Sequence, residues 1–258
     1  MTRAPHITVA PNGARLQKSD HARVPISTDE LAETARDCFV AGANAIHLHV
    51  RDKDGAHSLD SEIYREVITH LKQTAPDIEI QITTESADRF SVADQLHLLE
   101  TLKPAAASIS VREIARAPEL ISRVYSATAR HETKVQHILY DLSCVELLEQ
   151  WLASGLVPYK MRDSIFVLGQ YAPARAGKPN EIATLLDAAQ SLNLNVTVCA
   201  FGPNEQACLI EAAKVGCDLR VGFENNTRTP DGASWASNAQ AVAFLKAALN
   251  AQGKESAA

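Results

Sequence analysis

The sequence has no apolar run long enough to cross a membrane, no cluster of lysine and arginine, and no Cys-x-x-Cys pair. The first absence argues against a transmembrane helix, which needs about 20 consecutive apolar residues. The net charge of −6, without a basic cluster, argues against a nucleic-acid-binding surface. We therefore expect neither a membrane nor a nucleic acid among the partners of this chain.

The cysteines are odd in number and scattered: Cys38, Cys144, Cys199, Cys208 and Cys217. Cysteines without paired spacing are typical of reduced, buried thiols rather than of a disulfide framework. The first residues of the chain also lack the apolar segment of a secretion signal. Both observations predict a cytoplasmic protein.

Strand-like apolar runs alternate with helix-like stretches along the whole chain. The strand-like runs are His6–Ala10, Ala45–Val50, Ile78–Thr83, Ala106–Val111, Val135–Tyr140, Ser164–Leu168, Asn195–Phe201 and Leu219–Phe223. The helix-like stretches are Thr28–Ala41, Ser61–Gln73, Val92–Leu102, Pro118–Arg130, Val145–Ala153, Glu181–Leu192, Glu205–Val215 and Ser234–Leu249. This repeat implies a parallel sheet, because parallel strands need crossover connections.

Eight strand–helix units in 258 residues match the size of a (β/α)8 barrel, also called a TIM barrel. The predicted fold class is therefore α/β, with a single barrel domain over residues 1–252. The alternative is an open doubly wound sheet, but no Gly-x-Gly-x-x-Gly follows the first strand, which disfavours its dinucleotide-binding form. Residues 253–258 are expected to form a disordered tail.

A histidine pair stands in the second predicted strand. Side chains alternate between the two faces of a strand, so aliphatic residues take one face and His47 and His49 the other. Two imidazoles on one side are close enough to bind one metal ion, and a divalent metal would satisfy so polar a face. A His-x-His pair also occurs by chance, so a metal site needs a third ligand.

The eighth predicted strand offers that third ligand. Arg220 and Glu224 alternate there with aliphatic and aromatic residues, as the histidines do in the second strand. Even-numbered barrel strands contribute side chains to the same interior layers, which would bring Glu224 to the histidine pair. Two histidines, one carboxylate and an open position are typical of a catalytic zinc site. Alternatively, Glu224 is a capping or salt-bridging carboxylate at a strand end.

Other predicted strands also end in polar residues. Thr83 and Glu85 close the third strand, Ser108 lies in the fourth, and Asn12 follows the first. Catalytic groups of (β/α)8 barrels come from the C-terminal ends of strands, so these residues are candidates for substrate binding or catalysis. Polar loops at the mouth of any soluble barrel would give a similar pattern.

Taken together, these motifs resemble one family, the β-keto acid cleavage enzymes, which are zinc-dependent (β/α)8 proteins of the type that cleaves 3-keto-5-aminohexanoate. The resemblance covers most of the chain and rests on Ala41–Ala43, Ile46–Asp52, Ser58–Asp60, Gln81–Thr84 and Arg220–Asn226. The family condenses a β-keto acid with acetyl-CoA and releases acetoacetate and a new acyl-CoA. The resemblance thus implies a β-keto acid and a coenzyme A thioester as partners, and a homo-oligomer, with a tetramer expected.

The resemblance also implies a metal site. His47, His49 and Glu224 match the zinc ligands of the family, and Arg220 matches an arginine near the metal that orients the catalytic acid-base group. Zinc would bind the keto and carboxylate oxygens of the β-keto acid and favour loss of a proton from the carbon between them. The resulting carbanion would attack the thioester, and the coenzyme A thiolate would then cleave the condensed intermediate.

Substrate-binding residues follow from the same resemblance. Thr83 and Ser108 match hydroxyl positions that hold the substrate carboxylate, and Asn12 is expected to join them from the end of the first strand. The phosphate-rich co-substrate needs positive or hydroxyl groups near the mouth. Candidates for that contact, none of them assigned, are Arg175, Lys178, Arg228 and Thr229.

Two positions depart from the usual pattern of the family. Its Glu-Asp-Asn becomes Glu224-Asn225-Asn226 here, and the aspartate is the expected general base, whereas the amide of Asn225 cannot take a proton at neutral pH. The third strand usually ends in glycines, but here Glu85 follows. Three roles are open for Glu85: the missing base, a substrate-selecting residue, or a loop salt bridge. The predicted catalytic positions are accordingly Arg220, Glu85 and Asn225.

Two other functions fit part of the pattern. Barrel metal hydrolases also use His-x-His, but on the first strand and with further ligands that this chain lacks, so another metal-dependent lyase or aldolase is the better alternative enzyme. A barrel that binds a metal or a small acid without turnover is the other possibility, because the usual aspartate is missing.

Overall fold

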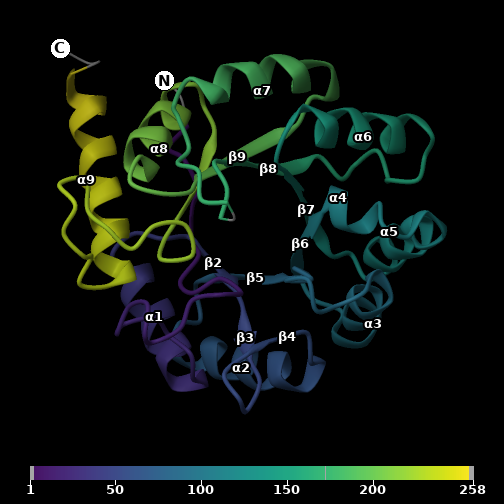
Figure 1. Cartoon of the computed structure of the whole chain (residues 1–258), viewed down its shortest axis with the longest axis horizontal. Helices are drawn as coiled ribbons and strands as arrows, with labels where there is room; N and C mark the ends of the chain where they lie inside the picture. Colours follow the sequence, from purple (N-terminus) through teal and green to yellow (C-terminus); the bar gives the residue numbers. More distant parts are fainter. Residues whose placement is uncertain (1–2, 172, 256–258) are drawn as a thin grey trace.

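Eight parallel strands close into a barrel in the computed structural model, which describes residues 3–171 and 173–255, with side chains up to residue 252. The strands are β1 (Ile7–Val9), β2 (Ala45–Leu48), β5 (Glu79–Thr83), β6 (Ala106–Ser110), β7 (Lys134–Leu139), β8 (Asp163–Leu168), β9 (Asn195–Ala200) and β10 (Asp218–Val221). Their order around the barrel is β1-β10-β9-β8-β7-β6-β5-β2 (Figure 1). The predicted (β/α)8 barrel is confirmed.

Helices surround the barrel and alternate with its strands along the chain (Figure 1). They are α1 (Thr28–Val40), α2 (Ser61–Thr74), α3 (Val92–Leu102), α5 (Ile121–Arg130), α6 (Leu142–Ala153), α7 (Glu181–Ala189), α8 (Glu205–Lys214) and α9 (Asn238–Glu255). Shorter turns are the one-turn helix α4 (Val111–Ile114) and the 3₁₀ helices η1 (Pro118–Leu120) and η2 (Gln190–Leu192). Local chemistry sets their starts: Ser27 and Ser91 each cap a helix through a reciprocal capping box.

Alternation along each strand separates two environments. In β2, Ile46 and Leu48 belong to the large apolar core that fills the space between the strands and the helices. His47 points the other way, into the barrel, and is 1% exposed. This period of two therefore places the apolar residues against the helices and leaves the polar residues for the barrel interior.

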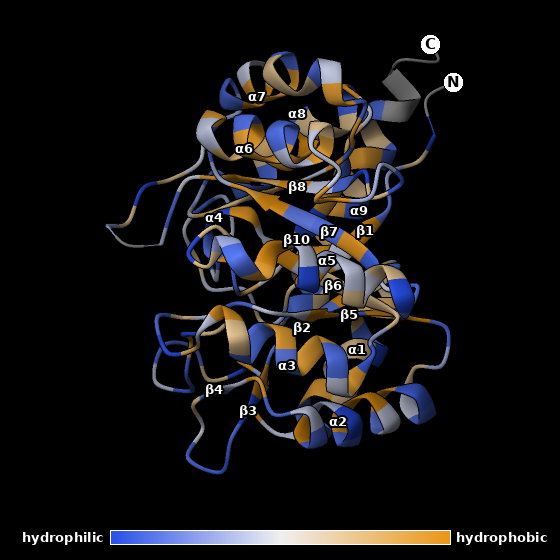
Figure 2. Ribbon diagram, turned by 90° about the vertical axis from the view of Figure 1, so that its right-hand side faces the viewer, coloured by the Kyte–Doolittle hydropathy of each residue, from blue (hydrophilic) through white to orange (hydrophobic). Residues whose placement is uncertain are grey.

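The run Ala45–Val50, predicted as one strand, is divided in the structure. The chain leaves the barrel after Leu48, and β3 (Val50–Arg51) then pairs antiparallel with β4 (His57–Ser58). Asp52 stabilises the turn between them, because its carboxylate accepts hydrogen bonds from the backbone N–H groups of Asp54 and Ala56. The resulting hairpin projects beyond the barrel (Figure 2).

The eighth barrel strand is shorter than predicted and ends at Val221. Gly222 turns the chain with a φ of +142°, and a Cβ atom at this position would lie 2.4 Å from the carbonyl oxygen of Ala10. Its N–H donates to the Glu205 carboxylate rather than to a neighbouring strand. Only glycine fits this close approach, so Glu224 lies in a turn and not on the strand face.

The C-terminal helix α9 continues to Glu255, so its backbone enters the segment expected to be a tail. Residues 256–258 of that segment lie outside the described residues. None of the helices in the described part of the chain combines the length and the apolarity that a membrane span requires.

Candidate active site

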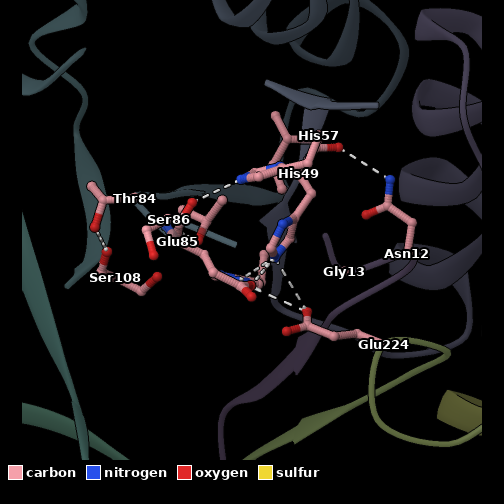
Figure 3. Close-up of polar contacts among 12 residues, drawn as sticks. Asn12, Gly13, His49, His57, Thr84, Glu85, Ser86, Ser108 and Glu224 are labelled. Atoms are coloured by element: carbon pink, nitrogen blue, oxygen red, sulfur yellow. Dashed lines mark hydrogen bonds and ion pairs between the residues drawn. The ribbon is translucent and has the colours of Figure 1, made fainter. Parts of the chain in front are cut away.

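The two histidines meet inside the mouth of the barrel. His47 lies on β2 and His49 directly follows that strand, so both imidazoles point inward. Their Nε2 atoms are 3.2 Å apart, and both side chains are almost completely buried. Asn12 fixes the position of the second histidine, because its side-chain amide donates to the carbonyl oxygen of His49 (Figure 3).

Glu224 completes the cluster from the other end of the chain. Its Oε2 lies 3.6 Å from Nε2 of His49 and 3.8 Å from Nε2 of His47. The backbone N–H of Glu224 donates to the carbonyl oxygen of Ala10, which anchors the turn against β1. The three side chains, which the sequence placed on two strands far apart in the chain, therefore lie together, and Figure 3 shows Glu224 directed toward the histidines.

The protonation states in this cluster suit a metal ion. Burial lowers the pKa of His47 to about 4 and the pKa of His49 well below its ordinary value, so both imidazoles are neutral. Burial alone would raise the pKa of Glu224, but the positive charge of Arg220 holds this pKa well below its usual range. Neutral imidazoles and an ionised carboxylate are the forms that bind a divalent metal.

The geometry of the cluster also fits a metal ion. Ligand atoms about 2.0–2.1 Å from a tetrahedral zinc ion lie roughly 3.3–3.4 Å from one another. The Nε2–Nε2 separation of 3.2 Å and the Nε2–Oε2 separations of 3.6 and 3.8 Å are within a few tenths of an ångström of that value. Oε2 of Glu224 is buried and has no hydrogen-bond partner among the described residues, which a cation would supply.

A chain of hydrogen bonds holds the imidazole of His47 through its Nδ1 atom. Nδ1 of His47 is 2.8 Å from Oε1 of Gln81, whose Nε2 donates to Gln136, which in turn donates to the hydroxyl of Thr197. With this polarity Nδ1 of His47 carries the proton and its Nε2 keeps a lone pair for a metal. Gln81, Gln136 and Thr197 also line a cavity of about 450 Å³ at the N-terminal end of the barrel. Catalytic groups of such folds lie at the opposite end.

Arg220 lies inside the barrel next to the cluster, as predicted from its strand face. Its Nη2 is 3.4 Å from Oε1 of Glu224 and 3.4 Å from Sγ of Cys199, and the residue is 3% exposed. The other guanidinium nitrogens, Nε and Nη1, are buried and have no partner among the described residues. A buried guanidinium with free N–H groups is a site for an anionic oxygen.

Glu85 stands on the open side of the histidine pair. Its Oε2 is 3.9 Å from Nε2 of His49, and its side chain is 27% exposed. Burial, together with the nearby charges of Glu224 and Glu113, raises the pKa of Glu85 to about 8. The backbone carbonyl of Glu85 also contacts Nε2 of His57 at 2.9 Å, so the β3–β4 hairpin holds the loop that carries this acid (Figure 3).

The two predicted hydroxyls are neighbours at the mouth. Thr83 and Ser108 are register partners on β5 and β6, and both are buried. The hydroxyl oxygen of Thr83 accepts a hydrogen bond from the backbone N–H of Glu85 and keeps its own proton for a further bond. The hydroxyl of Ser108 has no protein partner among the described residues, so it is free to bind a ligand.

The two predicted asparagines are less available. The amide nitrogen of Asn12 is bound to the carbonyl oxygens of Pro25 and His49, and only its Oδ1 has no partner. The side chain of Asn225 is buried and makes no hydrogen bond within the described residues, to Arg220 or to any other group. Asn12 therefore supports the candidate metal ligand His49, and Asn225 makes no contact of this kind with the cluster.

Sequence reasoning gave no role to two residues of the site. Gln81 shares a strand face with Thr83, so the period of two already placed it inside the barrel. His57 is buried, and its ring centroid is 5.1 Å from that of His49. The Asp54-Gly55 turn signal predicts a hairpin that returns His57 to the strand end.

Of the cations considered for phosphate binding, Arg175 is already paired with Glu181.

The fold and the cluster define a class of protein: a (β/α)8 barrel with a candidate metal centre at the catalytic end. Within that class, the model of the beta-keto acid cleavage enzyme family matches residues 6–258, and the chain belongs to this family. The resemblance drawn from the motifs is confirmed, and the protein is an enzyme that acts on β-keto acids.

Similar proteins of known function support the family assignment. The chain is 27% identical to the 3-keto-5-aminohexanoate cleavage enzyme of Acetoanaerobium sticklandii, over 92% of this chain and 88% of that protein. It is 24% identical to the 3-oxoadipate:acetyl-CoA acetyltransferase of Cupriavidus necator, over 98% and 91% of the two chains. The barrel also resembles that of ObcA in its complex with oxaloacetate, with a TM-score of 0.69, 16% identity, and 90% and 64% of the two chains covered.

Proposed function

We propose that this enzyme binds one zinc ion through His47, His49 and Glu224 and transfers the acyl part of a β-keto acid to coenzyme A, with acetyl-CoA as co-substrate. The buried convergence of two neutral imidazoles and one ionised carboxylate is the observation that carries the proposal. The names of related proteins that use acetyl-CoA support the co-substrate. The products would be acetoacetate and a new acyl-CoA.

Zinc, when bound, would supply Lewis-acid chemistry that acidifies the C–H group between the keto and carboxyl carbons of the substrate. The protein residues would carry the rest of the reaction. Ser108 and Thr83 would donate hydrogen bonds to the substrate carboxylate, which the free hydroxyl of Ser108 and the pairing of the two residues support. The free N–H groups of Arg220 would stabilise the oxyanion that forms when the thioester carbonyl is attacked.

Glu85 is the group proposed to move the proton. Its carboxylate lies 3.9 Å from Nε2 of His49, which is within reach of a substrate held at the cluster, whereas the amide of Asn225 has no basic atom. In its ionised form, Glu85 would take the proton from the substrate carbon. The carbanion then displaces coenzyme A from acetyl-CoA, the thiolate attacks the original keto carbon and releases the acyl-CoA, and Glu85 returns the proton to give acetoacetate.

The test combines metal analysis with one substitution. We expect about one zinc ion per chain, loss of activity with a chelator, and recovery with zinc. Glu85→Gln should lower turnover by ~10²–10⁴-fold while zinc content is unchanged, since this is the usual contribution of a general base. Full activity of metal-free protein would contradict the zinc centre. Unchanged turnover of Glu85→Gln would exclude this base, and Asn225→Asp would then be assayed for a gain.

The location and assembly belong to the same proposal. We propose a cytoplasmic homo-oligomer, with a tetramer as the expected state. All five cysteines are free and buried, which is consistent with a reducing compartment. Light scattering on the purified protein would measure the mass of the assembly directly.

A further inference from the structure

At the catalytic end of the barrel, the interior has a polar side and an apolar side. Strands β2, β5, β6 and β10 supply the histidines, the hydroxyls and Arg220 described above. Strands β7, β8 and β9 supply an apolar wall at this end, which we define as Ile138 on β7, Ile165 and Val167 on β8, and Cys199 on β9. Tyr140 and Phe201 pack against this wall at the ends of their strands.

Strand alternation separates the wall from the outer core. Phe166 and Leu168 on β8 belong to the core under the helices, whereas Ile165 and Val167 do not. Register pairs Val167 with Cys199, so the wall continues from β8 to β9. Figure 1 shows β8 across the barrel opening from β2, which carries the histidines. The wall therefore faces the candidate metal centre.

The wall also reaches the active site directly. Sγ of Cys199 is 3.4 Å from Nη2 of Arg220, and this same nitrogen is 3.4 Å from the carboxylate of Glu224. Phe201, Glu224 and Glu85 line one recess of about 40 Å³ at the mouth, together with Tyr171. A substrate held at the cluster is thus bounded by metal ligands on one side and by aromatic and aliphatic groups on the other.

The charged groups around this recess already have partners or roles. Arg15 pairs with Asp88 at 3.3 Å and lies over the ring of Tyr171. Glu224 contacts Arg220 and the histidines, and Glu85 faces His49. None of the wall residues carries a charge, and the cation that touches the wall, Arg220 beside Cys199, is the group proposed above to stabilise the oxyanion. Placing an amine or a second carboxylate against it would bury an unpaired charge, whereas methylene groups gain from leaving water.

We propose that the apolar wall selects a β-keto acid whose chain beyond the keto carbon is short, aliphatic and uncharged. This inference rests on the function proposed above and names its substrate class. Related proteins named for 3-keto-5-aminohexanoate and for 3-oxoadipate act on acids with an amine or a second carboxylate at that end. The apolar wall makes an acid with a plain alkyl end the better substrate for this chain.

Three acids with the same six-carbon chain test the inference: 3-oxohexanoate, 3-keto-5-aminohexanoate and 3-oxoadipate, each with acetyl-CoA and the zinc-loaded enzyme. We expect kcat/KM for 3-oxohexanoate to exceed both others by about tenfold or more, with butanoyl-CoA as the acyl product. A preference for either charged acid would overturn the inference but leave the proposed function standing. No acetoacetate from any of the three would overturn both.

A pair of matched substitutions assigns the preference to the wall. Val167→Ala should shift kcat/KM from 3-oxohexanoate toward the longer 3-oxooctanoate, because removing two methyl groups from the wall leaves room beside it for a longer alkyl chain. Val198→Ala removes the same atoms from an equally buried residue on the outer face of β9 and should lower the melting temperature without changing the preference. An equal shift in both variants, or none in Val167→Ala, would show that the wall does not select the substrate.

Discussion

Gly13 lies directly against the side chain of Glu224. A Cβ atom at position 13 would be 2.6 Å from Cγ of Glu224, and Gly13 has a φ of +58°. The loop after the first strand therefore supports the candidate metal ligand that arrives with the last strand. The missing side chain at position 13 leaves room for that carboxylate to face the histidines.

Gly13→Ala should weaken zinc binding by displacing Glu224. We expect the zinc affinity, measured by chelator competition, to fall about 10–100-fold, as it does when a group that positions a ligand is lost. Gly155→Ala is the matched control, because Gly155 also has a positive φ but has no atom within 4 Å of an added Cβ. Both changes should cost roughly 1–2 kcal/mol of stability, and equal zinc affinity in the two variants would refute the role of Gly13.

Gln81→Leu should remove the group that holds the proton on Nδ1 of His47. Zinc affinity should fall by about 10–100-fold, the usual cost of losing such a partner. Gln136→Leu is a graded comparison, since it breaks the next hydrogen bond but leaves the contact between His47 and Gln81 in place. Its loss of affinity should be smaller. An equal loss in both variants would point to general damage of the barrel interior.

Arg220→Lys should keep the positive charge beside Glu224 but remove the free N–H groups of the guanidinium. We expect turnover to fall by about 10²–10³-fold, the size of effect seen when an oxyanion donor is removed. The zinc content and the melting temperature should change little. If the melting temperature falls together with turnover, Arg220 has a structural role instead.

Glu205→Gln should change how stability depends on pH. Burial raises the pKa of Glu205 to about 8, so between about pH 4.5 and pH 8 the folded chain keeps a proton that the unfolded chain has lost. Stability of the native enzyme should therefore fall as the pH rises through this window. Glutamine can still accept the N–H of Gly222 and does not titrate. The difference in melting temperature, variant minus native enzyme, should therefore increase from pH 5.5 to pH 8.5. A difference that stays constant over this range would contradict the assignment.

The barrel and the histidine pair could be predicted because they depend on local periodicity. Alternation at His47 and His49 reports the two faces of β2 without any knowledge of the rest of the chain. The end of the last strand could not be predicted in this way, since the turn at Gly222 depends on its close approach to Ala10. Strand alternation predicted that Glu224 lies near the histidines, but in the structure the turn at Gly222 brings it there.

The roles of the remaining residues depend on contacts between loops. Sequence gave Asn12 a role toward the substrate, yet its amide is bound to the backbone of the second histidine. His57 joins the site only because the β3–β4 hairpin folds back beside Glu85. Such contacts leave no periodic pattern in the sequence, and only the assembled barrel shows them.

The candidate ligands come from opposite ends of the chain. β1 pairs with β2 on one side and with β10 on the other, so the histidines and Glu224 lie on either side of the seam where the barrel closes. An unfolded chain offers an ion only the two histidines, and the third ligand arrives when the last strand docks. An ion bound there would link the first and last parts of the barrel to each other. Its binding free energy would add to the stability of the closed barrel.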